Sequence, residues 1–534
     1  MSNGTPRTFP ISPRAAAGLL LFAWAALLLA KLLGPPDLMA NDQEKVAAYA
    51  MDAYANGNWI VMRDHEGAVM SKPPLATWIT GAFALALGGV NRLALVAPSA
   101  LAVLLSAALV LVIGWRWLTP AAGLLGAFAA LLNPYGLKAL GLVRTDPLFM
   151  GTTFLASILV WRAWVSGRGW TWAWLALAAA TLAKAPIALP LAAAGLLASL
   201  WERRTHAAAP VRGGHAAGIS LYVAITAGWF LAAYGVLGDA LVEKQIGDEL
   251  VGHAVKKFDA VGFFAKLFKP SLYYLSRTLP WAPLFLAALW LLWKHPPEDR
   301  AARLLLRFLA CGVLGGVAFF SVFPHQRADH LMPLMPGGML LAGWAAERLG
   351  AGRLLTRLGP RAVPAFAAAA LAAAAILSAA ARLEARGDRD LIASANMERL
   401  ASAIRAEAGG SPEVRFVEAP YALQYHLGVM RPVEKLAAVA GEWAGPGRVV
   451  AAVRKEARLR AALPADAPVH LLAGGEEYPG KSSVLLFSNQ PGAPPPMPER
   501  RLPWWLRGLG AIGALLALGG GGGAVWLASR GARE

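Results

Sequence analysis

Two charged side chains stand out in a polar stretch, residues 34–75, that lies between strongly apolar segments. Asp42 opens a predicted amphipathic helix, and Lys72 directly precedes Pro73-Pro74. A carboxylate can accept a proton from an attacking hydroxyl, and an ammonium group can hold a phosphate and neutralise it as it leaves. Because the two prolines restrict the backbone, they fix the direction in which Lys72 points. This stretch is therefore the first candidate for a reactive site.

Each of these charges also has a purely structural interpretation. Asp42 could simply cap the helix, since Asn41-Asp42 precedes it. Lys72 could be an interfacial lysine whose ammonium reaches out to water. Glu44 and Asp52, on the same predicted helix, are expected to be solvated surface charges. The residue types alone leave these alternatives open.

Later polar turns between apolar segments add further candidates. Together they mix cations with carboxylates, a combination that suits a phosphate-bearing lipid. Arg144 and Asp146 could instead pair with each other, Thr145 and Pro147 suit the start of a helix, and a lone histidine in a loop is usually solvated. The later candidates are Arg144, Asp146, Lys184, His253, Lys256, Lys257, Arg327 and His330.

The elements that must position these residues are membrane helices. Hydrophobic residues make up 57% of the 534-residue chain. Runs of about 18 or more apolar residues recur, which is typical of transmembrane helices, and open strands or irregular backbone cannot face lipid. The single cysteine, Cys311, excludes an intramolecular disulfide. The composition predicts a polytopic α-helical membrane protein rather than several soluble domains.

The formal net charge of +18 could suggest nucleic-acid binding. The arginines and lysines, however, cluster in short loops between apolar runs, as the positive-inside rule predicts. We therefore expect no nucleic-acid partner. Arg7 and Arg14 precede the first apolar run, which predicts a cytoplasmic N-terminus. That run is long for a signal peptide and no convincing cleavage site follows it, so we expect an uncleaved first span.

The apolar runs predict about 12 transmembrane helices. Residues 1–383 would form the transmembrane domain, with a catalytic outer loop over residues 34–92. The apolar segment 72–89 is expected to lie in the outer interface, because counting it as a crossing would move later basic loops outside. The predicted spans are residues 15–33, 93–114, 120–138, 147–165, 170–183, 185–201, 216–237, 273–293, 305–323, 331–346, 362–381 and 504–528.

The chain becomes polar from residue 384 to residue 501. Predicted helices alternate there with predicted strands, which indicates a small α/β domain. We expect it outside the membrane, on the same side as Asp42. A proline-rich linker, residues 490–498, leads to the last span and a cytoplasmic tail, residues 502–534. The predicted helices are residues 391–408, 421–426 and 455–462, and the predicted strands are residues 414–417, 449–453, 469–472 and 483–487.

The order of motifs in the first outer loop resembles a known family. Asp42 is followed by Gly57-Asn-Trp-Ile-Val-Met-Arg63 and then by Ser71-Lys72-Pro73-Pro74. This order is similar to that of the bacterial aminoarabinose transferase and protein O-mannosyltransferase-like family, membrane glycosyltransferases of the C-type superfamily. The chain departs from the family pattern at Gln43 and at Ser71, where the family has acidic residues.

Later segments resemble further motifs of the same family. Arg144-Thr145-Asp146 resembles its second acidic site, and Lys184-Ala185-Pro186 resembles its Lys-Gly-Pro turn. Gln326-Arg327, followed by His330-Leu-Met-Pro333, resembles its Lys-Arg and Tyr-Leu-Leu-Pro. Arg327 is the cation that this last motif retains.

The resemblance implies an enzyme that takes a sugar from undecaprenyl phosphate, a polyprenyl-phosphate carrier in the bilayer. The sugar would pass to an envelope acceptor on the periplasmic face of the bacterial inner membrane, with inversion of the anomeric carbon. Lipid A, a polysaccharide, another glycolipid and a protein are all open as acceptors. Asp42 and Asp146 are implied as the catalytic carboxylates. The implied contacts to the donor phosphate are Lys72, Arg144, Lys184, Lys256, Lys257 and Arg327.

A metal ion is conceivable but is not favoured. His253 resembles a histidine that, in the aminoarabinose transferase branch, is implied to bind a metal together with the acid before Lys-Pro-Pro. Ser71 occupies that acidic position here and is a poor zinc ligand. His253 and His330 are therefore kept as candidates for a contact with substrate or metal, and no cofactor is predicted with certainty.

Two other classes of protein compete with the transferase. A lipid or sugar transporter or flippase would carry ionisable residues inside many spans, whereas here the predicted spans are nearly free of acids. A noncatalytic assembly or sensor protein would bind its partner through the predicted α/β domain and would not need Asp42. The chain contains no Walker A loop and no dinucleotide-binding glycine motif after a strand, so no nucleotide site is expected.

Overall fold

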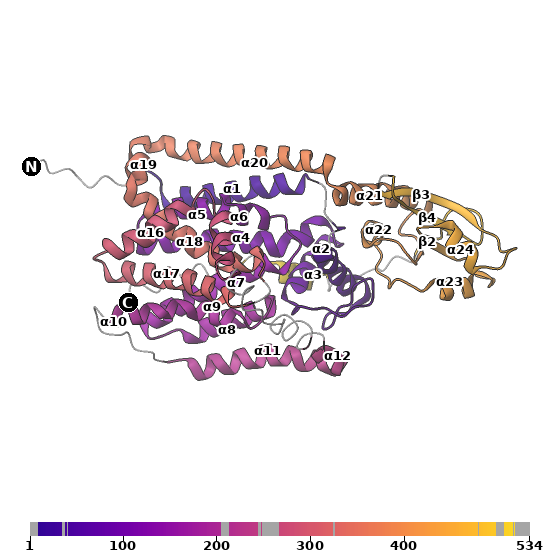
Figure 1. Cartoon of the computed structure of the whole chain (residues 1–534), viewed down its shortest axis with the longest axis horizontal. Helices are drawn as coiled ribbons and strands as arrows, with labels where there is room; N and C mark the ends of the chain where they lie inside the picture. Colours follow the sequence, from indigo (N-terminus) through magenta and orange to yellow (C-terminus); the bar gives the residue numbers. More distant parts are fainter. Residues whose placement is uncertain are drawn as a thin grey trace, which may run out of the picture.

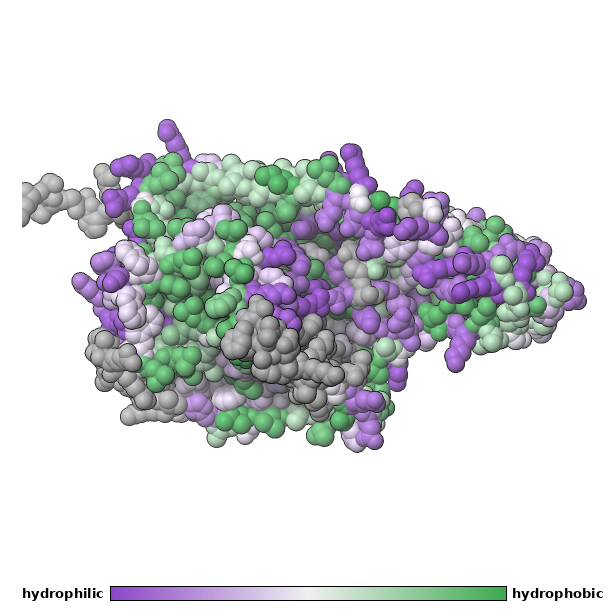
Figure 2. All heavy atoms as spheres, viewed as in Figure 1, coloured by the Kyte–Doolittle hydropathy of each residue, from purple (hydrophilic) through white to green (hydrophobic). Residues whose placement is uncertain are grey.

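The computed structural model describes residues 9–34, 38–39, 41–203, 213–243, 247, 266–323, 326–478, 480–497, 507–515, 517 and 519. These residues form a large helical part and, at one end of it, a smaller region that holds a sheet (Figure 1). Over the helical part, hydrophobic side chains cover the middle, and hydrophilic ones gather at both ends (Figure 2). Such a hydrophobic band between charged ends is the surface expected of a protein that spans a bilayer.

Six described helices are long and apolar enough to cross a membrane, and a bent pair would make a seventh. The long helices include α1 (Pro13–Leu32), α4 (Arg92–Trp117), α7 (Thr145–Ser166), α11 (His215–Leu237) and α17 (Arg300–Ser321), and the sixth stretch ends with α20 (Ala362–Gly387). The chain is thus a multi-span helical membrane protein. The total of about 12 spans stays a prediction, because the remaining apolar helices are shorter.

These shorter helices lie close to where the sequence predicts spans, but some are broken. The predicted span 273–293 consists of α15 (Lys269–Arg277) and α16 (Ala282–Lys294), which bend by 111°. The predicted span 120–138 divides at Asn133-Pro134, where a new helix starts. Of the glycine run 519–523, only Gly519 is described. The other helical segments are α3 (Leu75–Leu87), α5 (Pro120–Leu132), α8 (Trp170–Ala183), α9 (Ala188–Ala193), η2 (Ala194–Leu197), α10 (Ala198–Arg203), α12 (Asp239–Val242), α18 (Met335–Ala346), η5 (Glu347–Ala351), α19 (Gly352–Leu358) and η6 (Gly359–Arg361).

Small residues let the central helices approach closely. A Cβ atom added to Gly343 of α18 would lie only 2.7 Å from the Cα atom of Gly126 in α5. A Cβ atom added to Gly114 of α4 would lie 2.9 Å from the backbone nitrogen of Gly123, also in α5. In a membrane, close van der Waals packing of this kind is a main source of helix–helix association. The packing of α4, α5 and α18 therefore gives a rigid base for the segments at the end of the bundle.

Three short segments at one end of this bundle carry the polar residues of interest. They are α2 (Asn41–Met51), which continues into the π-helical turn η1 (Asp52–Asn56), then α6 (Pro134–Ala139), and the 3₁₀ segment η4 (Ala328–Leu334). Asn133 starts α6 locally, because its side-chain oxygen accepts a hydrogen bond from the Gly136 N–H at 3.1 Å. The same end of the bundle faces the sheet-containing region (Figure 1).

That region contains a four-stranded sheet in the order β1-β2-β4-β3. Strands β1 and β2 are parallel, and β4 is antiparallel to both β2 and β3. Every helix and strand predicted here is present, but the sequence analysis missed α23, a helix of only eight residues. The elements are α21 (Arg389–Ala408), β1 (Arg415–Phe416), α22 (Tyr421–Leu427), α23 (Leu436–Trp443), β2 (Val450–Val453), α24 (Glu456–Ala462), β3 (His470–Tyr478) and β4 (Ser482–Ser488).

Candidate active site

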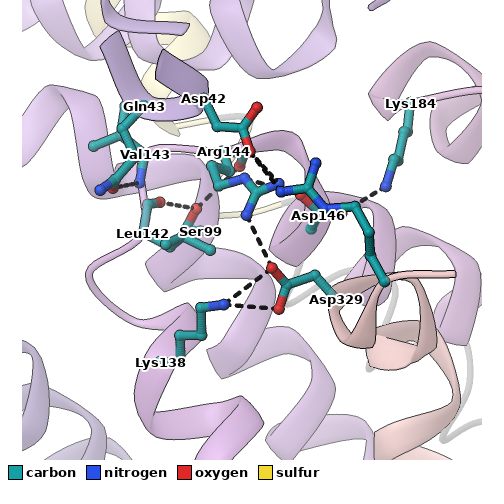
Figure 3. A network of polar contacts seen from close by, with 11 residues as sticks. Asp42, Gln43, Ser99, Lys138, Leu142, Val143, Arg144, Asp146, Lys184 and Asp329 are labelled. Atoms are coloured by element: carbon teal, nitrogen blue, oxygen red, sulfur yellow. Dashed lines mark hydrogen bonds and ion pairs between the residues drawn. The ribbon is translucent and has the colours of Figure 1, made fainter. Parts of the chain in front are cut away.

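Asp42 belongs to a network of ion pairs that joins segments far apart in the chain (Figure 3). Its Oδ2 atom is 3.0 Å from Nη2 of Arg144 and 2.8 Å from Nη2 of Arg327. The Asp42 side chain is half exposed and sits in the first turn of α2. Capping of its own helix therefore does not account for the carboxylate, because both arginines come from other elements.

Asp146 is the second carboxylate of the network, in the first turn of α7. Its Oδ1 atom is 2.5 Å from Nζ of Lys184, and its Oδ2 atom is 3.4 Å from Nε of Arg144. The Asp146 side chain is only 5% exposed. Lys184 follows directly after α8, in apolar surroundings. A lysine in such a place requires an anionic partner, and Asp146 is that partner.

The network also contains two residues that the sequence analysis missed. Asp329, in η4, accepts the Nη1 donor of Arg144 at 2.9 Å. Lys138, in α6, places its Nζ atom 2.8 Å and 3.0 Å from the two carboxylate oxygens of Asp329. Figure 3 shows Asp329 between Arg144 and Lys138. An ion pair between positions nearly two hundred residues apart leaves no local spacing signal, and the matched family motif does not include either position.

The backbone that carries Arg144 is held by two further side chains. Gln43 of α2 accepts a hydrogen bond from the Val143 N–H at 3.0 Å, and Ser99 of α4 donates its hydroxyl to the Leu142 carbonyl at 2.5 Å. Gln43 is one of the positions at which the chain departs from the family pattern. The amide still links α2 to the residue before Arg144, so this departure leaves the architecture of the site intact.

The charges in the network nearly balance. Four cations, Arg144, Arg327, Lys138 and Lys184, face the three carboxylates of Asp42, Asp146 and Asp329. Burial on its own would raise the pKa of Asp42, but the hydrogen bond from Arg327 and the charge of Arg144 together lower it below its ordinary value. Asp42 is therefore anionic at neutral pH, and the cluster as a whole carries one excess positive charge.

The remaining predicted site residues are His330, Lys72, His253, Lys256 and Lys257. His330 follows Asp329 in η4, where its ring lies 5.8 Å from that of Phe320. Lys72 is half-buried in the turn before α3. His253, Lys256 and Lys257 lie outside the described residues. Among the described residues, no group of three or more histidine, cysteine or acidic side chains is arranged to hold a metal ion.

Asp52 is buried and the Glu44 side chain is only 13% exposed, so the expectation that both are solvated was wrong. Asp52 is 4% exposed, and its carboxylate accepts hydrogen bonds from the side chains of Asn56 and Asn58, at 2.7 Å and 3.0 Å, and from the Arg63 N–H at 2.8 Å. These hydrogen bonds hold the backbone and side chains of the outer loop around the Asp52 carboxylate. The amphipathic pattern missed this role because the partners lie beyond the regular helix, in η1 and the turns after it.

Glu44 links the outer loop to the sheet-containing region. Its Oε1 atom is 3.1 Å from Nε2 of His65, whose ring packs against the Tyr421 ring of α22 at a centroid distance of 5.4 Å. The His65 carbonyl accepts a hydrogen bond from the Val433 N–H at 2.7 Å. Burial, supported by the nearby charge of Glu66, raises the pKa of Glu44 to about 7. Glu44, two residues after Asp42, thus fastens helix α2 to α22.

Comparisons with known proteins agree with the resemblance that the sequence motifs carry. Residues 71–230 match the model of the dolichyl-phosphate-mannose-protein mannosyltransferase family. The undecaprenyl phosphate-alpha-4-amino-4-deoxy-L-arabinose arabinosyl transferase 1 of Pseudomonas fluorescens is 27% identical over 365 residues. That match covers 65% of this chain and 61% of the relative, so it spans less than two thirds of the relative's length.

Solved structures extend the similarity to nearly the whole fold. The structure of ArnT from Cupriavidus metallidurans bound to undecaprenyl phosphate aligns with a TM-score of 0.67 at 16% identity, covering 90% of this chain and 98% of that one. Its apo structure aligns with a TM-score of 0.65 at 17% identity. The matched family and the Pseudomonas fluorescens relative are transferases, and they give the transporter alternative no support. The chain thus has the ArnT-like fold, and its similarity to the aminoarabinose transferase and protein O-mannosyltransferase-like glycosyltransferases is confirmed.

Proposed function

We propose that this protein is an integral-membrane glycosyltransferase that moves a sugar from a polyprenyl-phosphate carrier to an envelope acceptor. The observation that carries the proposal is the Asp42–Arg144–Arg327 cluster, an anionic carboxylate held among cations at one end of a membrane bundle. The likeness to transferases that use undecaprenyl phosphate supports the choice of donor. The acceptor is lipid A, a polysaccharide, another glycolipid or a protein.

The reaction is a single displacement at the anomeric carbon of the sugar. An oxygen of the acceptor forms a bond to this carbon while the bond from the carbon to the carrier's phosphate oxygen breaks, and the configuration inverts. The bonding electrons leave with the phosphate, so negative charge develops there. Arg327, which is 45% exposed and pairs with only Asp42 among the carboxylates of the network, is the best-placed cation of the network to neutralise that charge, and we assign the same role to Lys72.

Asp42 positions the acceptor on the opposite side of the reaction. Its Oδ2 atom is occupied by the two arginines, so we assign the contact with the acceptor to Oδ1. The lowered pKa makes Asp42 a weak base. It can take a proton from an acceptor hydroxyl only when the new bond is well advanced, and it needs to take none if the acceptor is a phosphate anion. Asp146, buried against Lys184, is assigned to holding Arg144 in place.

We place the site on the periplasmic face of the inner membrane. The arginines of α19 and η6, at the opposite end of the bundle, would then lie in the cytoplasm together with the N-terminus. The sheet-containing region, residues 384–501, would form an extracytoplasmic α/β domain beside the site. Residues 502–534 would cross the membrane once more and end in the cytoplasm.

The test is mass spectrometry of envelope glycolipids from a deletion strain that carries wild-type protein or Asp42→Asn. This substitution keeps the side-chain size but removes the charge that holds both arginines. We expect a sugar-sized mass to disappear on deletion, to return with the wild type, and to stay at least about a hundredfold lower with Asp42→Asn. Full restoration by Asp42→Asn would remove this residue from the mechanism.

A control and two further fractions complete the design. Asp466→Asn changes an exposed carboxylate far along the chain and should restore the product fully. Envelope glycoproteins from the same strains cover the protein acceptor. Envelope polysaccharides from the same strains cover the remaining acceptor. If none of the three fractions changes on deletion, the transferase proposal fails.

A further inference from the structure

Asp329 is the one carboxylate of the network that has no assigned part in the transfer. It is 12% exposed, and each of its oxygens lies within 3.0 Å of a cationic nitrogen. It lies between two residues that the sequence motif singles out, Arg327 and His330, but is not itself part of that motif. Its partners Lys138 and Arg144 come from two different elements, so it is the point at which α6, η4 and the start of α7 meet.

The backbone of Asp329 is fixed independently of its side chain. Tyr135 of α6 donates its hydroxyl to the carbonyl of Ala328 at 2.6 Å. The Tyr135 ring is 1% exposed, so this contact is part of the packed interior. Together with the Lys138–Asp329 pair, it fastens η4 to α6 at two successive residues. The direction of the Asp329 carboxylate is therefore set by the fold before any substrate arrives.

The guanidinium of Arg144 is aimed by three carboxylates at once. Nη2 contacts Asp42 at 3.0 Å, Nη1 contacts Asp329 at 2.9 Å, and Nε lies 3.4 Å from Asp146. A planar guanidinium presents its donors in a fixed fork, so fixing Nη1 also fixes the direction of Nη2. Arg144 is 14% exposed, whereas Arg327 is 45% exposed and has Asp42 as its one carboxylate partner in the network. The two arginines on Asp42 therefore differ: one is locked and the other is accessible.

We propose that Asp329 is a positioning residue for the transfer, which orients the locked Arg144 so that Asp42 faces the acceptor. Lys138 neutralises Asp329 on its other side, which keeps Asp329 from competing with Asp42 for Arg327. Asp329 touches neither donor nor acceptor in this arrangement. The inference rests on the proposed function and deepens it, because it assigns the orientation of Asp42 to a residue outside the matched motif.

The first experiment compares rate with donor binding for Asp329→Asn. We expect product formation by membranes, measured on the glycolipid that the deletion strain lacks, to fall about tenfold to a hundredfold, because small displacements of a reacting group have effects of this size. Binding of undecaprenyl phosphate to the purified protein should change less than about threefold, because the accessible Arg327 is untouched. Asp329→Glu should restore part of the rate. A parallel loss of binding would place Asp329 in the donor site and overturn the proposal.

The second experiment tests whether Asp329 acts through Arg144. On an Arg144→Lys background, Asp329→Asn should lower product formation less than about threefold further, because residues that act as one unit are not additive. Lys138→Gln, which leaves the Asp329–Arg144 contact in place, should have a smaller effect than Asp329→Asn. The inference would be contradicted if the effects of Asp329→Asn and Arg144→Lys on the rate simply multiply. It would also be contradicted if the rate of Asp329→Asn stays within about twofold of wild type.

The same cycle of variants, read by thermal unfolding of the purified protein, separates the inference from the proposed function. If wild-type membranes form no product but the unfolding temperatures of Asp329→Asn and Arg144→Lys are non-additive, the transferase proposal fails while the orienting contact stands. If the wild type is active and neither readout shows coupling, Asp329 has no positioning role. Asp466→Asn again serves as the exposed control, with no expected change in either readout.

Discussion

At the scale of single residues, the motif spacing predicted candidate charges that lie together in the structure, but not how they pair. Asp42, Arg144, Asp146, Lys184 and Arg327 were all candidates from the sequence, and the structure joins all of them in one network. Their partners could not be derived, because an ion pair between distant segments has no local pattern. This is why Asp329 and Lys138 were missed, and why the three carboxylates around Arg144, which stays a predicted phosphate contact, could not be derived.

The buried Lys184–Asp146 pair leads to a prediction about stability. Lys184→Met leaves the Asp146 carboxylate, 5% exposed, with the more distant Arg144 at 3.4 Å as its remaining ion-pair partner in the network. Removing one partner of a buried pair costs about 3–5 kcal/mol, because a buried charge is left uncompensated. Thermal unfolding of the purified protein in detergent should show a clearly lowered midpoint for Lys184→Met.

Two further variants make this test specific. Lys481→Met removes an exposed lysine and should leave the midpoint unchanged. Asp146→Asn combined with Lys184→Met should recover part of the loss, because the neutral amide is cheaper to bury than the lone carboxylate. Equal midpoints for Lys184→Met and Lys481→Met would show that Asp146 finds another partner.

At the scale of elements, periodicity and hydropathy were reliable where a helix or strand is long and regular. The predicted span 147–165 is α7, and the predicted helix 391–408 is α21. They failed where an element is short or irregular: η1, α6 and η4 are each seven residues or shorter. These irregular segments carry Asp52, Lys138 and Asp329. The polar residues whose roles the sequence patterns missed thus lie on the elements that these patterns describe worst.

The contact between α2 and α22 predicts a specific dependence of stability on pH. The pKa of Glu44 is raised, mainly by burial, from 4.5 to about 7. A carboxyl group with a raised pKa binds its proton more tightly in the folded state. Its stabilising contribution is therefore complete below pH 4.5 and is lost as the pH rises through about 7. Glu44→Gln cannot ionise, so the unfolding midpoint of the wild type should fall relative to this variant between pH 5 and pH 8.

His65, the ion-pair partner of Glu44, provides the control for this measurement. Burial lowers the pKa of His65, so its contribution has the opposite sign: it is present above the ordinary value of 6.5 and is lost as the pH falls. The unfolding midpoint of His65→Gln should therefore rise relative to that of the wild type as the pH falls. The midpoint of Glu44→Gln should rise relative to that of the wild type as the pH rises. Asp64, Glu66 and Lys45 are the other charges around the pair. Parallel curves for the wild type and Glu44→Gln would show that Glu44 is solvated after all.

At the scale of the whole molecule, the arrangement of the network explains why so much of the chain is needed for one small site. The cluster draws on α2, α6, α7, the end of α8 and η4, which only the bundle brings together. The sheet-containing region then fastens α2 from outside through Glu44, His65 and Tyr421. Hydropathy could predict the bundle, because backbone that faces lipid must satisfy its own hydrogen bonds, as a helix does. Hydropathy could not predict which helix ends lie next to one another, because that arrangement depends on side-chain packing.

The orientation of the molecule leads to the last prediction, which needs a single reporter cysteine. Cys311 is the chain's one cysteine, so Cys311→Ser gives a background without thiols. Asp466 is exposed in the sheet-containing region, and Arg357 is exposed on α19 at the other end of the bundle (Figure 1). Because basic short loops stay in the cytoplasm, a membrane-impermeant maleimide should label Asp466→Cys in intact spheroplasts and Arg357→Cys only after permeabilisation. The reverse pattern would place the Asp42 cluster in the cytoplasm, where it could not act on an envelope acceptor. Labelling of both positions in intact spheroplasts would contradict the crossings between them, since α20, 26 residues long, must carry the chain across the bilayer from one reporter to the other.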